Sequence, residues 1–167
     1  MDYIVEQHHS PQILLKQVIQ LMHPQGYPTH ALLIDDDETW LQVMTARLES
    51  FGFKVTASVH PETFWDTLED CRPDLLILDI KMPKVSGLEL CKVLRSHPDW
   101  QSIPVMFVST ATDCPTQMGG IVAGADEFIS KQLDVDVIVR RIMNRLARFP
   151  RVPSSKFIPA QAKSSRL

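Results

Sequence analysis

The 167-residue sequence has no long apolar run and few cysteines. No stretch approaches the ~20 consecutive apolar residues that cross a bilayer, and the N-terminus lacks the basic-then-apolar pattern of a secretory signal. We therefore expect a cytoplasmic protein with no membrane segment. The three cysteines, Cys71, Cys91 and Cys114, are odd in number and far apart. This spacing argues against a disulfide framework or a zinc site and indicates reduced thiols.

Glycine is scarce where one class of enzyme would need it. A nucleotide- or flavin-binding protein with alternating strands and helices requires a glycine-rich phosphate loop after its first strand. Here the corresponding loop reads Asp35-Asp36-Asp37-Glu38, which would repel a phosphate in the absence of a metal ion. The sequence therefore argues against that class.

Acidic residues are missing from the C-terminal end of the chain. Residues 1–136 hold nine Lys and Arg and all 20 Asp and Glu, whereas residues 137–167 hold eight basic residues and no acid. A basic end can contact nucleic acid or an acidic partner, but a solvated helix end followed by a linker or tail at 150–167 is the more ordinary explanation. Direct nucleic-acid binding is therefore not expected.

Residues 1–28 form an extension that does not follow the pattern of the rest. Pro11 can start a helix whose apolar stripe runs to Met22, and Pro24, Gly26 and Pro28 then end it. We expect at most one helix here. Packing on the domain, dimerisation and a disordered leader are all roles compatible with the extension.

Residues 30–149 alternate between short apolar strands and amphipathic helices. The expected strands are 31–34, 53–58, 75–78, 105–108 and 127–130. Five helices are expected, the first with its apolar face at Trp40, Leu41, Met44, Leu48 and Phe51. This alternation predicts an α/β domain with a doubly wound parallel sheet and helices on both faces.

Polar residues follow four of these strands at the point where each strand ends. They are Asp35 and Asp36 after the first strand, Asp79 after the third, Ser109 after the fourth and Lys131 after the fifth. In a flavodoxin-like sheet of order 2-1-3-4-5, an order adopted from known proteins, these ends converge on one crevice, which is where ligands bind. A shared site is therefore expected.

The residues of this crevice suit phosphoryl transfer. Three carboxylates together repel one another unless one is protonated or a cation lies among them, and Mg²⁺ suits oxygen ligands of this kind. Asp79 could attack as the nucleophile and form an aspartyl phosphate, while Lys131 neutralises charge and Ser109 donates a hydrogen bond. Each residue alone has a simpler explanation, as a helix cap, a turn residue or a solvated lysine. Their joint placement favours a functional site.

Residues 30–149 resemble the receiver domain of two-component response regulators. The resemblance is carried by Asp35-Asp36, by Leu-Asp-Ile-Lys-Met-Pro around Asp79, by Gly87, by Pro104 with Ser109 five residues later, and by Gly-Ala-Asp-Glu-Phe before Lys131. It implies a bacterial signalling protein, phosphorylated on Asp79 by a histidine kinase or a histidine phosphotransfer protein. No enzymatic activity is expected beyond Mg²⁺-dependent self-phosphorylation and dephosphorylation.

The resemblance also implies roles for individual residues. Asp36, Asp79 and the backbone carbonyl of Lys81 would hold Mg²⁺, with Asp35 acting through water. Ser109 and Phe128 would form the switch that responds to phosphorylation. The surface of the fourth helix, fifth strand and fifth helix would then report the change to a partner, an output domain or a second copy of the chain.

The sequence departs from the family pattern in three places. Gln132 stands where proline usually follows the site lysine, and we expect a trans bond because a cis bond without proline costs ~2.5–4 kcal/mol. Thr110 replaces a small residue, which would narrow access to the phosphoryl group, while Gly119 and Gly120 suggest a mobile fourth helix. Gln132 and Thr110 favour the alternative function, a receiver-like scaffold that binds partners without being phosphorylated.

Overall fold

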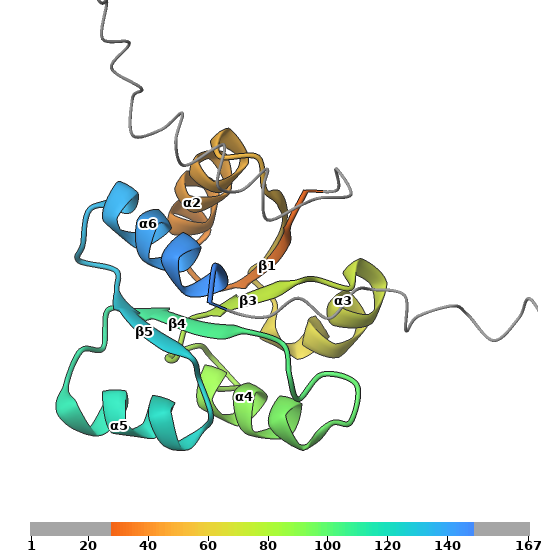
Figure 1. Ribbon diagram of the computed structural model, residues 1–167. Coiled ribbons are helices and arrows are strands. Elements are labelled where there is room, and N and C mark those ends of the chain that lie inside the picture. The colour runs from red at the N-terminus through yellow and green to blue at the C-terminus, as the bar shows by residue number, and fades with distance from the viewer. Residues whose placement is uncertain (1–27, 149–167) are drawn as a thin grey trace, which may run out of the picture.

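The computed structural model describes residues 28–148, in which five parallel strands form one sheet of order β2-β1-β3-β4-β5 (Figure 1). The predicted fold class and strand order are confirmed. The predicted N-terminal extension and C-terminal tail lie outside the described residues, apart from Pro28. No helix within residues 28–148 is long and apolar enough to span a membrane.

The elements follow one another in strict alternation. In chain order they are β1 (His30–Ile34), α2 (Glu38–Ser50), β2 (Lys54–Ser58), the 3₁₀ turn η1 (Pro61–Thr63), α3 (Phe64–Cys71), β3 (Leu75–Leu78), α4 (Gly87–Ser96), β4 (Val105–Ser109), α5 (Cys114–Val122), β5 (Glu127–Ser130) and α6 (Val135–Leu146). Each strand starts and ends within one residue of its predicted bounds. Pro61 begins η1, which leads directly into α3.

The three central strands are buried because helices cover both faces of the sheet. Every residue of β1, β3 and β4 is buried, as a strand with no solvent-facing side requires. Helices α2 and α6 pack on one face, and α3, α4 and α5 lie on the other (Figure 1). The apolar runs seen in the sequence thus form two cores separated by the sheet.

The paired glycines of α5 are explained by close packing. Gly120 is buried, and a Cβ added there would lie 3.1 Å from the ring of Phe107, while one added at Gly119 would lie 3.3 Å from Cδ1 of Leu88. The missing side chains therefore let α5 approach both the sheet and α4. This packing accounts for the glycines without requiring a mobile helix.

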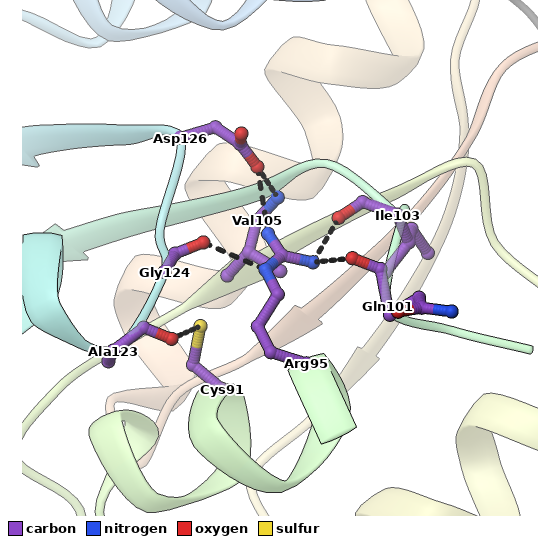
Figure 2. A network of polar contacts seen from close by, with 8 residues as sticks. All are labelled: Cys91, Arg95, Gln101, Ile103, Val105, Ala123, Gly124 and Asp126. Carbon is purple, nitrogen blue, oxygen red and sulfur yellow. Dashed lines mark hydrogen bonds and ion pairs between the residues drawn. The ribbon is translucent and has the colours of Figure 1, made fainter. Parts of the chain in front are cut away.

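Arg95 at the end of α4 ties together three segments at the edge of the sheet opposite the polar crevice (Figure 2). Its guanidinium donates to the carbonyl oxygens of Gly124, Gln101 and Ile103 and pairs with the Asp126 carboxylate at 2.9 Å. The same Asp126 oxygen accepts from the amide that begins β4. This network fixes the loops before β4 and β5 to α4.

Candidate functional site

The ends of β1, β3, β4 and β5 meet at one edge of the sheet. Backbone hydrogen bonds continue just past the strands, so that the amide of Asp79 donates to Ile34 and that of Lys131 donates to Ser109. Asp35, Asp79 and Ser109 are all buried there. The structure therefore brings together the residues that the sequence placed at strand ends.

Lys131 forms a buried ion pair at this edge. Its Nζ donates to Oδ1 of Asp35 at 2.7 Å, lies 2.6 Å from Oδ2, and is 3.9 Å from Oδ1 of Asp79. The side chains of Lys131, Asp35 and Asp79 are only 8%, 1% and 6% exposed. The explanation of Lys131 as a solvated lysine is therefore wrong.

Burial dominates the ionisation of Asp35. It raises the pKa of this carboxyl group to about 6, although hydrogen bonds from Lys131 and from the amide of Asp37 lower it. The neighbouring charge of Asp79 raises the pKa further. One lysine thus only partly offsets the cost of placing two buried carboxylates together.

The carboxylates also form a set that fits a metal ion. Oxygen atoms of Asp35, Asp36 and Asp79 lie within 4.8 Å of one another, and Asp36 is exposed to solvent. Oδ1 of Asp79 is buried and has no hydrogen-bond partner among residues 28–148. A hard divalent cation takes oxygen ligands in such surroundings. The role of the Lys81 backbone carbonyl as a ligand of the metal ion stays a prediction.

Gly87 is required by the backbone that carries Asp79. A Cβ added at Gly87 would lie 2.0 Å from the carbonyl oxygen of Asp79, and the amide of Gly87 donates to the carbonyl of Ile80 at 3.1 Å. The first turn of α4 is thus built against the end of β3. The sequence motif includes this glycine, but the close approach that demands it is visible only in the fold.

The two predicted switch residues lie in different surroundings. Ser109 is fully buried, and its Oγ accepts from the amide of Ala111 at 3.3 Å. Phe128 is half-buried on the core beneath α3, α4 and α5, where a Cβ at Gly120 would lie 3.8 Å from its ring. Thr110 is exposed beside this region. The switch roles of Ser109 and Phe128 stay predictions.

The loop after Lys131 uses a backbone donor that proline lacks. The amide of Gln132 donates to Oγ of Ser130 at 3.2 Å, and the amide of Leu133 donates to the Ser130 carbonyl at 3.2 Å. No cis peptide bond occurs between residues 28 and 148, which confirms the expected trans bond at Gln132. The turn is therefore held by hydrogen bonds instead of by a proline ring.

Trp40 is a neighbour of the site that the sequence did not reveal. The Nζ of Lys131 lies 4.8 Å from the centre of the Trp40 ring. In the sequence, Trp40 is simply one position on the apolar face of a helix, and no spacing rule connects it with a lysine 91 residues later. Only the fold, in which the Lys131 side chain reaches Asp35 at the end of β1, brings it to the first turn of α2.

Comparison with known proteins defines the class to which this fold and site belong. The family model of the response regulator receiver domain matches residues 31–143. The chain belongs to the family of response regulator receiver domains. Such domains are signalling modules and not classical enzymes.

Individual relatives agree with this assignment. The chain is 38% identical over 138 residues to protein RcaC of Microchaete diplosiphon, covering 83% of this chain and 21% of RcaC. It is 34% identical over 121 residues to the transcriptional regulatory protein CseB of Streptomyces coelicolor, covering 72% of this chain and 50% of CseB. The chain thus spans only part of the length of these relatives.

A solved structure supports the same conclusion. The signal receiver domain of a signal transduction histidine kinase from Syntrophus aciditrophicus has 28% sequence identity and a TM-score of 0.68, with 75% of this chain and 96% of that chain covered. The likeness extends over nearly the whole of that receiver, so this chain contains a full receiver fold.

Proposed function

We propose that this receiver is switched by phosphorylation of Asp79. The observation that carries the proposal is the state of Oδ1 of Asp79, a buried carboxylate oxygen without a hydrogen-bond donor among the described residues and 3.9 Å from the Lys131 ammonium. A buried carboxylate oxygen that is engaged by no donor is suited to attack. The donor would be the phosphohistidine of a histidine kinase or of a phosphotransfer protein.

Asp79 acts as the nucleophile in this reaction. A carboxylate oxygen forms a bond to phosphorus as the bond between phosphorus and the donor breaks, and the product is an acyl phosphate on Asp79. Lys131 is close enough to move from Asp35 toward the incoming phosphoryl oxygens. The Ser109 hydroxyl, whose oxygen accepts from the amide of Ala111, can still donate a hydrogen bond to one of them.

The acidic set provides the ligands for Mg²⁺. Asp36, Asp79 and the backbone carbonyl of Lys81 would hold the ion, and Asp35 would act through a bound water. The clustering of three carboxylates within 4.8 Å supports this assignment. When bound, Mg²⁺ would supply positive charge that neutralises the phosphoryl oxygens.

The response would be read on the face formed by α5, β5 and α6, the fourth helix, fifth strand and fifth helix of the sequence prediction. Three apolar side chains of α5 support this choice, because Met118, Ile121 and Val122 are 55%, 66% and 76% exposed. Phosphorylation would shift an equilibrium between two states through Ser109 and Phe128. The reader is an effector protein, an output domain or a second copy of the chain.

The scaffold alternative is not favoured. It relied on Gln132 and Thr110, yet Gln132 serves the turn after β5 through its amide, and Thr110 is exposed instead of filling the crevice. The acidic set and the lysine are both present and assembled. Nothing in the crevice requires that phosphorylation has been lost.

Intact-mass measurement tests the proposal. The protein is incubated with acetyl phosphate and Mg²⁺, and the expected result is the gain of one phosphoryl group that requires Mg²⁺ and is absent from Asp79→Asn. Circular dichroism of both proteins controls for folding. A folded protein that binds Mg²⁺ but gains no phosphoryl group from acetyl phosphate or phosphoramidate would contradict the proposal and favour the scaffold function.

A further inference from the structure

Trp40 lies against Lys131 in the crevice. It stands in the first turn of α2, where its amide donates to Oδ1 of Asp37 at 3.0 Å, and its half-buried ring packs on the core beneath α2 and α6. The ring centre is 4.8 Å from the Nζ of Lys131. A tryptophan face at this distance attracts a cation through its quadrupole.

The surroundings of the Lys131 ammonium divide into two kinds of contact. The oxygens of Asp35 hold it at 2.6 and 2.7 Å, and Asp79 lies farther away at 3.9 Å. The Trp40 ring is a further neighbour of Nζ, and the lysine side chain is only 8% exposed. The ammonium is thus shielded from water although it ends a flexible four-carbon stem.

The two kinds of contact differ in how far they let the Lys131 ammonium move. A hydrogen bond to Asp35 is lost when Nζ moves by about an ångström, because its strength depends on distance and angle. The attraction to an aromatic face tolerates displacement across the ring, since it acts out to about 6 Å from the centroid. Lys131 can therefore move from Asp35 toward Asp79 while it remains in contact with Trp40.

We propose that Trp40 is a positioning residue for Lys131. It keeps the ammonium in the crevice and out of water, and it allows the ammonium to pass from Asp35 to a phosphoryl group on Asp79. This inference rests on the proposed function, because it concerns how Lys131 serves phosphorylation at Asp79. Trp40 itself contacts none of the reacting atoms.

The rate of phosphorylation by acetyl phosphate at saturating Mg²⁺ provides the first test. Trp40→Leu should slow it by about 2- to 30-fold, the range that cation–π contacts span. Trp40→Phe should slow phosphorylation less than Trp40→Leu does, because a phenyl ring retains part of the attraction to the ammonium. Trp65→Leu is the matched control and should leave the rate unchanged, since Trp65 lies on α3 with its ring 5.9 Å from that of His97.

A double-mutant cycle separates positioning from a merely structural role. In a Lys131→Met background, Trp40→Leu should have no further effect on the rate of phosphorylation, because no cation is left to position. An equal fold-loss with and without Lys131 would overturn the inference.

The same cycle on urea unfolding needs no phosphoryl group. The two substitutions should be coupled by about 2- to 30-fold in the unfolding equilibrium constant, and an absence of coupling would overturn the inference. If the wild-type protein gains no phosphoryl group at all, the proposed function fails and the positioning role fails with it. The unfolding cycle then still reports whether the Trp40–Lys131 contact exists, so the two failures are distinguishable.

Discussion

Replacement of Gly87 by alanine tests how closely α4 approaches the strand end that carries Asp79. The added Cβ would lie 2.0 Å from the carbonyl oxygen of Asp79, 3.0 Å from its carbonyl carbon and 3.3 Å from the Cα of Ile80. All three atoms belong to the backbone. None can move aside by a side-chain rotation, so either α4 or the end of β3 must shift.

The expected cost follows from this geometry. Restoring ordinary contact requires a separation of about 1.4 Å between two backbone segments, and overpacking of this kind costs about 1–3 kcal/mol. Alanine regains at most about 1 kcal/mol from its higher helix propensity, and Gly87 is the first residue of α4, where this gain is smallest. We expect the free energy of unfolding to fall by about 1–3 kcal/mol.

Urea unfolding followed by circular dichroism measures this change, and Gly119→Ala is the matched control. A Cβ at Gly119 would lie 3.3 Å from a terminal methyl group of Leu88, which can rotate. Gly119→Ala should therefore stay within about 1 kcal/mol of the wild-type protein. If Gly87→Ala proves as stable as Gly119→Ala, the close approach of α4 to Asp79 is wrong.

Three further predictions concern stability. Gln132→Pro should lower the free energy of unfolding in urea by about 1 kcal/mol because it removes the amide that donates to Oγ of Ser130. Gln132→Ala retains that amide and should lose less, so an equal loss in both variants would show that this hydrogen bond does not stabilise the turn. Arg95→Leu should lower the free energy of unfolding by about 3 kcal/mol because three carbonyls and a carboxylate lose their donor. Arg47→Leu breaks a more exposed ion pair and should lower it by no more than about 1 kcal/mol. Similar losses for the two arginines would contradict this ranking. Burial raises the pKa of Asp35 to about 6, so near pH 5 the folded state binds a proton that the unfolded chain has released. In Mg²⁺-free buffer the contribution of this group to stability should be complete below about pH 4 and should be lost, by up to about 3 kcal/mol, as pH rises through 6. The difference between the pH profiles of the wild-type protein and Asp35→Asn isolates this contribution, and identical profiles would show that the pKa is not raised.

Most of the fold could be predicted from the sequence. The apolar runs at 31–34, 75–78 and 105–108 are typical of strands buried on both faces, and their alternation with amphipathic helices favours parallel pairing. The order of the strands could not be predicted in the same way. Alternation of strands and helices does not determine which strands pair, so the predicted order was taken from known proteins, and the structure confirms it.

The candidate site was also predictable in its main members. Asp35, Asp79, Ser109 and Lys131 each follow a strand, and the carboxyl ends of parallel strands lie at one edge whatever the details of packing. The identities of these residues then point to a phosphoryl site. Their positions in the sequence were enough to predict that they lie near one another, because the pairing of parallel strands alone brings the residues that follow those strands to one edge of the sheet.

Contacts between segments that are distant in the sequence could not be predicted and are visible only in the folded structure. The contact of Trp40 with Lys131 and the close approach of Gly87 to Asp79 join parts of the chain with no local pattern in common. Gly120 suggested a mobile helix in the sequence, but in the structure it makes room for the ring of Phe107. Helical periodicity gives the face on which a residue lies but not what that face meets, because the meeting depends on how separate elements pack.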